Sequence, residues 1–222
     1  MRLFCQLMTI PNTIIMNIAL KLLPVALALP MLVGCAGEKG GAASGEISNP
    51  VTENIMARRS IRAYKNVPVS RDTLDVILEC GINAPSAMNN QNWEVRMVDN
   101  INAFGGIVDS QADGQSADLP GLFHGAPAVA FVANKAGASM SEIDCALLGE
   151  NMLLAAKSLG IGTCFMGWPV NFFKSDAGKP YLEKLGFSEG YELLYVISFG
   201  YPAEDPEAKP RDASKARYVD FQ

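Results

Sequence analysis

The sequence has a single histidine, and its cysteines lack the spacing of a metal site. The histidine is His124. The five cysteines are Cys5, Cys35, Cys80, Cys145 and Cys164. Structural zinc sites draw four ligands from closely spaced cysteines and histidines, usually with a CxxC pair, and disulfide frameworks need matched cysteines. The scarcity of histidine and the absence of CxxC therefore argue against both kinds of site.

The chain also lacks an excess of positive charge. It has 18 Lys and Arg against 23 Asp and Glu, a formal net charge of −5. Nucleic-acid-binding domains hold phosphates on a basic face, so we expect no nucleic-acid partner. A dinucleotide-binding glycine motif is missing as well. Gly160 and Gly162 follow a predicted helix and precede a predicted strand, which is the reverse of the order in a Rossmann fingerprint.

The N-terminal apolar stretch is too short for a comfortable membrane-spanning helix. Lys21 precedes apolar residues 22–31, which prolines interrupt, whereas a spanning helix needs about 20 apolar residues. The stretch suits a signal peptide, and it ends in Leu32-Val33-Gly34-Cys35, which resembles the bacterial lipobox. That resemblance implies a signal peptide over residues 1–35 and lipidation of Cys35. The mature protein would then be exported and lipid-anchored to a bacterial membrane, on the periplasmic or surface side.

Two alternatives for this segment stay open, an ordinary secretory signal and an anchor that is not cleaved. The translation start is open too. Residues 16–35 alone form a complete short signal, whereas residues 1–15 add a second apolar stretch.

Apolar residues make up 49% of the chain, enough for a sizeable core. Residues 36–50 are rich in glycine, alanine and serine, which is typical of a flexible tether, so we expect the folded domain over residues 51–222.

Within this domain, the apolar patterns predict a helix at 51–59, a second helix that begins after an N-cap at Ser70, and a third at 143–159. They predict strands at 93–98, 127–133, 163–166 and 193–199. Residues 101–125 predict a loop or short helix, and the charged, proline-containing tail 200–222 should wrap around the domain. The alternation of helices and strands, without internal repeats, predicts an α+β layered fold.

Two polar clusters carry the strongest functional signal. Arg58-Arg59-Ser60-Ile61-Arg62 places three guanidinium groups and a hydroxyl within five residues, a set suited to a phosphate. Residues 84–93, Ala-Pro-Ser-Ala-Met-Asn-Asn-Gln-Asn-Trp, offer hydroxyl and amide groups on a proline-interrupted loop. Together they predict an anion clamp and a polar cradle for one flat, phosphorylated ligand.

The order of the motifs resembles the FMN-dependent nitroreductase family over residues 51–211. Beyond the two clusters, the resemblance includes Gly125-Ala126-Pro127, Gly160-Ile161-Gly162-Thr163-Cys164, Gly200-Tyr201-Pro202 and Lys209-Pro210-Arg211. It implies a central mixed β-sheet flanked by helices, in an interlocked homodimer with two FMN sites at the subunit interface. Residues 51–222 would form the FMN-binding domain.

The resemblance also implies roles for individual residues. The phosphate, ribityl chain and pyrimidine edge of FMN would be held from one subunit by Arg58, Arg59, Ser60 and Arg62, with Lys209 and Arg211 completing the phosphate clamp. The isoalloxazine would be lined from the other subunit by Pro85, Ser86, Ala87, Asn89 and Gln91. The backbone of Met166 and Gly167 would lie near the flavin N5, so that no side chain acts as a catalytic acid or base.

The implied activity is a ping-pong oxidoreduction, in which NADH or NADPH reduces FMN and a nitroaromatic, quinone or similar acceptor reoxidises it. A small-molecule acceptor and a lipid anchor would be the other partners. Two departures from the family pattern are Asn92, where a proline is frequent, and residues 101–123, which match no family helix. His124 is expected to be structural or exposed, Cys164 to be a small core residue, and Trp93 and Trp168 to pack. Two alternatives stay open, that His124 contacts substrate and that Trp168, next to the Met166-Gly167 segment, lines the pocket.

Three functional alternatives follow from these observations. The first is the FMN oxidoreductase, which raises a tension, because nicotinamide cofactors are cytoplasmic and the predicted signal directs export. Either the signal is misinterpreted or the electron donor is another compound. The second alternative is a lipoprotein that binds flavin or a related ligand without turnover. The third is a flavin-fragmenting or dehalogenating member of the same superfamily.

Overall fold

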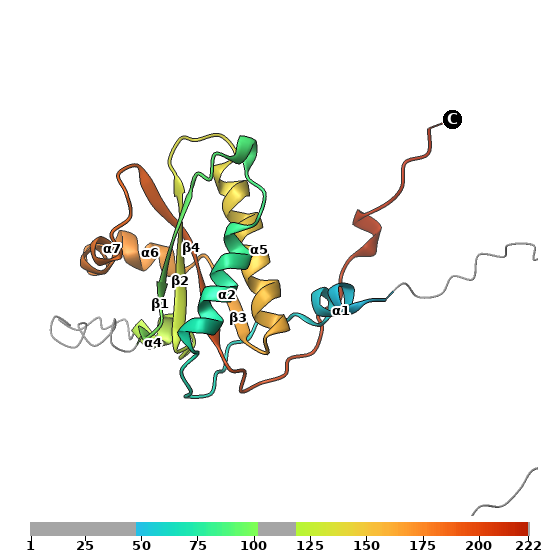
Figure 1. Ribbon diagram of the computed structural model, residues 1–222, viewed down its shortest axis with the longest axis horizontal. Coiled ribbons are helices and arrows are strands. Elements are labelled where there is room, and N and C mark those ends of the chain that lie inside the picture. Colours follow the sequence, from blue (N-terminus) through green and yellow to red (C-terminus); the bar gives the residue numbers. More distant parts are fainter. Residues whose placement is uncertain (1–47, 102–118, 222) are drawn as a thin grey trace, which may run out of the picture. The chain divides into compact units, whose positions relative to one another are not determined.

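A four-stranded antiparallel sheet lies at the centre of the computed structural model, which describes residues 48–101 and 119–221 (Figure 1). The strands stand in the order β1-β2-β4-β3. Their bounds are β1 Trp93–Val98, β2 Ala128–Lys135, β3 Gly162–Met166 and β4 Tyr191–Gly200. The parallel component of the expected mixed sheet is confined to one isolated bridge between Ser60 and Thr163. Each predicted strand is present, and β4 begins two residues earlier than its apolar run.

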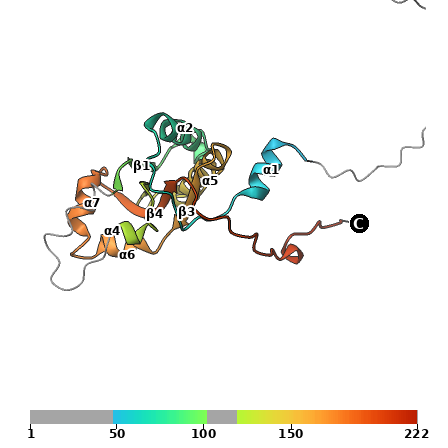
Figure 2. The ribbon, with the colours of Figure 1, turned by 90° about the horizontal axis from the view of Figure 1, so that it is seen from below.

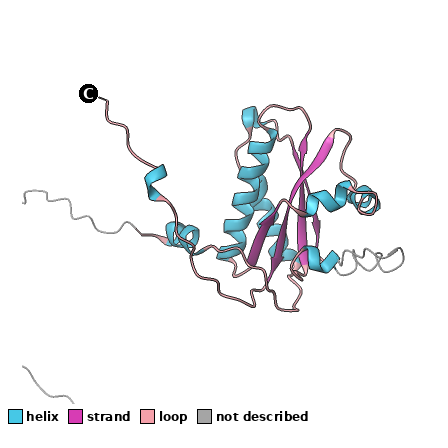
Figure 3. Ribbon diagram, turned by 180° about the vertical axis from the view of Figure 1, so that it is seen from behind, coloured by secondary structure: helices cyan, strands magenta, loops and turns pink. Residues whose placement is uncertain are grey.

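Helices cover both faces of the sheet (Figures 2 and 3). The long helices α2, Arg71–Ile82, and α5, Ser141–Ser158, pack on one face, and α4, Leu119–Leu122, α6, Pro169–Lys174, and α7, Lys179–Leu185, lie on the other. Helix α1, Pro50–Ala57, precedes this layered body. The α+β layered fold that the sequence predicts is therefore confirmed.

The two middle strands are buried on both faces, as the nearly continuous apolar run of β4 predicts. On one face, Ile197 belongs to a cluster with Leu148 of α5 and Ile77 of α2. On the other face, the rings of Phe131 and Phe173 meet edge to face with centroids 5.3 Å apart. Each face of the sheet thus has its own core.

The starts of α1 and α2 follow capping residues in the sequence. The Ser70 hydroxyl accepts a hydrogen bond from the Thr73 N–H, 3.2 Å away, at the start of α2. Asn49 and Thr52 form a reciprocal capping box at α1. The predicted N-cap at Ser70 is confirmed. The helix expected over residues 51–59 ends at Ala57, because Arg58 turns into extended backbone.

Helices α6 and α7 were absent from the sequence expectations. Each has a proline in its first turn and runs for only six or seven residues, which is too short to display two turns of helical periodicity. Their packing against the sheet stabilises them instead, through Phe173 and Tyr181, which are buried.

Among its described residues, the tail after β4 contributes no buried residue to the core, as expected. The expectation that it wraps around the domain is wrong within one chain, because residues 207–221 are exposed. The predicted signal peptide with Cys35, most of the tether and residues 102–118 of the unmatched segment lie outside the described residues. Within residues 48–101 and 119–221, no helix has the length and apolar character that crossing a membrane requires.

Candidate functional site

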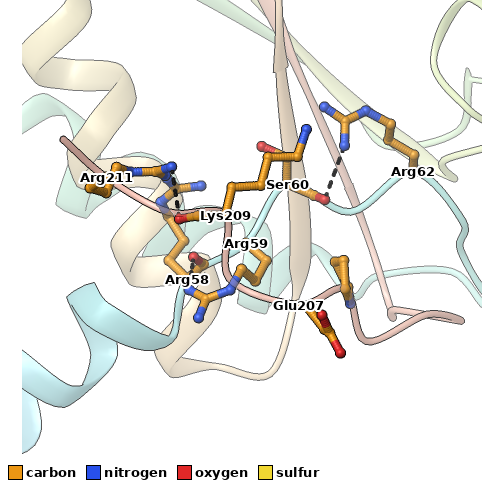
Figure 4. A pocket seen from close by; sticks show the side chains of 8 residues that line it. Arg58, Arg59, Ser60, Arg62, Glu207, Lys209 and Arg211 are labelled. Carbon is orange, nitrogen blue, oxygen red and sulfur yellow. Dashed lines mark hydrogen bonds between the residues drawn. The ribbon is translucent and has the colours of Figure 1, made fainter.

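A cationic pocket forms where the start of the domain meets its tail (Figure 4). Its volume is about 110 Å³. The lining residues are Arg58, Arg59, Ser60, Arg62, Pro206, Glu207, Lys209 and Arg211. The six residues that the resemblance assigns to the phosphate, the ribityl chain and the pyrimidine edge therefore line one pocket, which we call the clamp. Pro206 and Glu207 were not anticipated, because neither belongs to a recognisable motif.

Backbone pairing positions the first half of the clamp. The Ile61 N–H donates to the Thr163 carbonyl at 2.8 Å, which places the residues after α1 alongside β3. Ile61 is buried against Gly162, where an added Cβ would lie 2.9 Å from the Ile61 Cγ1. The close approach therefore requires glycine at position 162.

The tail is attached to the same segment by three further hydrogen bonds. The Lys65 N–H donates to the Tyr201 carbonyl at 2.8 Å, and the Ala203 N–H donates to the Ala63 carbonyl at 2.9 Å. The Arg62 N–H donates to the Glu204 carboxylate. Residues 61–65 and 201–204 thus run together, and the chain beyond them delivers Lys209 and Arg211 to the clamp.

Among the residues that the structure describes, five cationic side chains and one carboxylate, that of Glu207, line the clamp. Arg59 Nη1 donates to the carbonyls of Met56 at 2.7 Å and Arg58 at 2.8 Å, and so satisfies the C-terminal end of α1. Arg211 Nη1 donates to the Lys209 carbonyl at 3.3 Å. A guanidinium has five N–H donors, so each of these arginines retains donors for a ligand. The charge and the donor chemistry fit a phosphate group.

The single histidine lies near this cluster. His124 is partly buried and adopts a left-handed backbone conformation with φ 59°. Burial lowers the pKa of its imidazole, and the positive charge of Arg62 lowers it further. The expectation that His124 is structural or exposed agrees with this position.

Cys164 is only 2% exposed, and burial raises the pKa of its thiol. A buried, protonated thiol is a poor nucleophile. The interpretation of Cys164 as a small core residue is confirmed. No group of three or more His, Cys, Asp or Glu side chains suited to a metal ion occurs in the part of the chain that the structure describes.

The second predicted cluster forms a strained turn away from the clamp. A single 3₁₀ turn, η1, spans Ala87–Asn89, and Met88, Asn89 and Gln91 have φ values of 51°, 57° and 50°. Such left-handed backbone is unfavourable for side chains such as those of Met88 and Gln91, and less so for Asn89. Within one chain, none of the residues in 85–91 lines the clamp. We call residues 85–91 the cradle.

The end of β3 exposes backbone at Gly167. An added Cβ at this residue would meet nothing within 4 Å. Phe165 is 48% exposed and Trp168 is 51% exposed. Trp93 packs against the core as expected, whereas the same expectation for Trp168 is wrong within one chain. Trp168 follows the edge strand β3 and precedes the short helix α6, and within the described part of the chain about half of its side chain stays exposed.

Sequence reasoning also missed an acidic residue that holds the cradle. The Ala87 N–H donates to Asp144 Oδ1 at 3.0 Å, from a position 57 residues away in the chain. A lone aspartate at the start of a helix gives no signal of such a contact, because nothing in its spacing points to the loop.

Comparison with known proteins places this geometry in a family. The model of the nitroreductase family matches residues 55–201. A protein of Vibrio harveyi named NADPH-flavin oxidoreductase is 29% identical over 178 residues, covering 73% of this chain and 70% of that protein.

Solved structures agree with this match. A nitroreductase with bound FMN from Bacteroides fragilis is 30% identical with a TM-score of 0.66, covering 78% of this chain and 100% of that one. A nitroreductase with bound FMN from Desulfitobacterium hafniense is also 30% identical, with a TM-score of 0.67 and the same coverage. The family match spans more than half of the sequence, and the similar structures are covered along their full length. The chain therefore belongs to the nitroreductase family.

Proposed function

We propose that the protein is an FMN-dependent oxidoreductase that uses NADH or NADPH as its electron donor. The observation that carries the proposal is the clamp, in which residues from both ends of the domain concentrate five cations around one phosphate-sized pocket. The names of the similar proteins, which include FMN-bound nitroreductases and an NADPH-flavin oxidoreductase, support it.

The residues present fit FMN. The phosphate, the ribityl chain and the pyrimidine edge would be held by Arg58, Arg59, Ser60 and Arg62, and Lys209 and Arg211 would complete the phosphate clamp. A cation from Arg59 or Arg62 beside that edge would stabilise negative charge on the ring. The N–H groups of Met166 and Gly167 would orient the reacting edge.

When bound, FMN supplies the hydride-transfer chemistry, in a ping-pong sequence from the nicotinamide donor to a nitroaromatic, quinone or similar acceptor. The chain's own task is to bind the ring, orient it and set the charge around it. No side-chain acid or base is needed for this, which suits a site whose only nearby imidazole has a lowered pKa.

The active form is proposed to be a homodimer in which the cradle of one subunit faces the clamp of the other. Two observations support this arrangement. The cradle lies away from the clamp within one chain, and large apolar side chains are exposed on α1 and α5. Those side chains are Val51, Ile55, Met56, Ile143 and Leu147. Apolar surface of this kind is typical of an interaction site.

We further propose that the mature protein is exported and anchored to a membrane by lipid on Cys35. The support is the lipobox-like sequence at the end of the apolar stretch. An extracytoplasmic position would separate the enzyme from cytoplasmic nicotinamide cofactors, so in that case a different reductant would serve as donor.

Anaerobic titration tests the oxidoreductase. The purified protein should be yellow, release FMN on denaturation, lose its colour on addition of NADH or NADPH, and regain it with a nitroaromatic or quinone. A colourless protein that FMN does not reconstitute would contradict the proposal. A flavin-loaded protein inert to both donors would favour the non-catalytic flavin-binding alternative.

The same turnover assay tests the shared site. Arg211→Ala and the double variant Asn89→Ala/Gln91→Ala should each be impaired alone. Co-expression should restore about a quarter of the wild-type sites, since each mixed dimer regains one intact site. No recovery in verified mixed dimers would place clamp and cradle in the same subunit.

Arg211→Ala should weaken FMN binding by about tenfold or more, because one charge-assisted hydrogen bond is lost. Riboflavin lacks the phosphate, so its dissociation constant should not change. Arg217→Ala is the matched control, an exposed arginine of the same tail outside the clamp, and Cys164→Ala should likewise retain FMN. Both flavins can be followed by fluorescence quenching. Equal losses for FMN and riboflavin would show that Arg211 does not act on the phosphate.

The pKa of His124 should rise when Arg62 is replaced by glutamine, because the nearby positive charge is removed while the burial stays. Since the folded-state pKa lies below 6.5, protonation of His124 destabilises the wild-type fold as pH falls from that value. As the pH falls below 6.5, the Arg62→Gln variant should lose less stability than the wild type. Imidazole NMR titration measures the pKa directly, because the chain has one histidine. Arg71→Gln, whose partner is Asp99, is the control; an equal change in both variants would refute the Arg62 effect.

Lipidation predicts that cells fed a labelled fatty acid incorporate label into the wild-type protein but not into Cys35→Ala. The variant should also leave the membrane fraction, because the acyl chains supply the anchor. Cys5→Ala serves as the control for nonspecific labelling. Label that persists in Cys35→Ala would exclude this site.

A further inference from the structure

Asp144 is a nearly completely buried carboxylate beside the cradle. It lies in the first turn of α5 and is 2% exposed. Its Oδ1 accepts the Ala87 N–H at 3.0 Å. Its Oδ2 has no hydrogen-bond partner among the residues that the structure describes.

This burial is costly. A carboxylate removed from water without a cation loses hydration that a single hydrogen bond does not replace. None of the ion pairs in residues 48–101 and 119–221 includes Asp144. The N-terminal end of α5 offsets part of the cost, because a negative charge is favoured there. Among the residues that the structure describes, its side-chain hydrogen bond is to Ala87 in the cradle, which suggests that supporting the cradle is the function of this buried carboxylate.

The cradle needs support from outside itself. Its internal hydrogen bonds include those from the Asn89 N–H to the Ser86 carbonyl at 3.0 Å and from the Gln91 N–H to the Ser86 hydroxyl at 3.2 Å. These bonds tie the loop to itself while three of its residues occupy left-handed backbone. Such conformations persist when the surroundings over-determine them. The chain connects the cradle to α2 and β1 at its two ends, and the hydrogen bond to Asp144 joins it to helix α5.

Helix α5 provides that rigidity. Its residues Cys145, Leu148 and Met152 are completely buried between α2 and the sheet. Tyr195 of β4 donates its hydroxyl to the Cys145 carbonyl, one residue from Asp144. Asp144 is therefore held in place relative to the sheet, and its hydrogen bond holds Ala87 in place as well.

We propose that Asp144 is a positioning residue that holds the cradle in the conformation that receives the flavin ring. The proposal rests on the FMN function proposed above. In this role the carboxylate touches neither ring nor substrate and acts through the Ala87 N–H. The proposed role depends on Oδ1 as the acceptor for the Ala87 N–H. It does not depend on the negative charge, because Oδ2 accepts no hydrogen bond from the described residues.

The substitution set follows from that distinction. Asp144→Asn keeps an accepting oxygen for Ala87 and removes the charge. Asp144→Ala removes the acceptor and opens a small space, and Asp144→Val removes it while filling most of that space. Ser141→Ala is the matched control, since Ser141 is equally buried on the same helix but donates to the Lys135 and Ala138 carbonyls instead.

Two measurements on the full-length protein test the proposal. Hydrogen exchange of residues 86–91 without flavin should accelerate about tenfold in Asp144→Ala and Asp144→Val, the effect of one lost hydrogen bond. FMN binding should weaken by a similar factor in those two variants. Asp144→Asn and Ser141→Ala should match the wild type in both measurements.

The outcomes separate this proposal from the proposed function. If the wild type does not bind FMN, the FMN function fails, and the exchange data still test the contact. Should Asp144→Ala and Asp144→Val keep slow exchange and wild-type FMN affinity, the positioning role is overturned. Equal losses in Asp144→Asn and Asp144→Ala would overturn it too, because the charge would then be the important property.

Discussion

The close approach of residues 60–64 to a pair of facing glycines is the contact on which the candidate site depends. Gly162 and Gly200 stand opposite each other in β3 and β4. Ile61 packs on the first, and Tyr64 packs on the second, where an added Cβ would lie 2.7 Å from the Tyr64 ring. The missing side chains let an extra segment lie against the sheet and hydrogen-bond to Thr163. The same segment then pairs with the tail, so both halves of the clamp follow from one packing contact.

The clamp concentrates charge that the fold itself does little to neutralise. Glu207 is the acidic residue among the described residues that line it. Arg58 Nε lies 4.0 Å from the Glu150 carboxylate, a separation at which a partly exposed pair contributes little. Local carbonyls accept from Arg59 and Arg211. These contacts orient the guanidinium groups without cancelling their charge, which leaves an electrostatic potential suited to a dianion.

Features that depend on neighbouring residues in the chain could be predicted from the sequence. Ser70 marks a helix start by its own hydroxyl, the apolar run of β4 marks a doubly buried strand, and the arginine cluster marks an anion site. Recognition of Lys209 and Arg211 as members of that site came from the order of motifs, not from their spacing. Their position in the same pocket agrees with it.

What escaped prediction depends on contacts between distant parts of the chain. Helices α6 and α7 are too short for periodicity and exist through their packing on Phe131 and its neighbours. Asp144 and Glu204 are ordinary acidic residues in sequence, and their roles come from a backbone N–H brought to them by folding. Trp168 was expected to pack because large aromatic side chains usually do, but its place after an edge strand leaves it exposed.

The separation of the clamp's two halves in sequence has a consequence for cofactor loading. Arg58 and Arg211 lie at opposite ends of the domain, so the unfolded chain does not present the clamp and a phosphate-bearing ligand binds the folded state selectively. Such a ligand raises the free energy of unfolding by RT ln(1 + L/Kd), where L is the free ligand concentration and Kd its dissociation constant. If the chain crosses a membrane unfolded, as the proposed signal implies, it must fold and acquire FMN on the far side. The affinity of the clamp for FMN would then determine whether the exported enzyme acquires its cofactor.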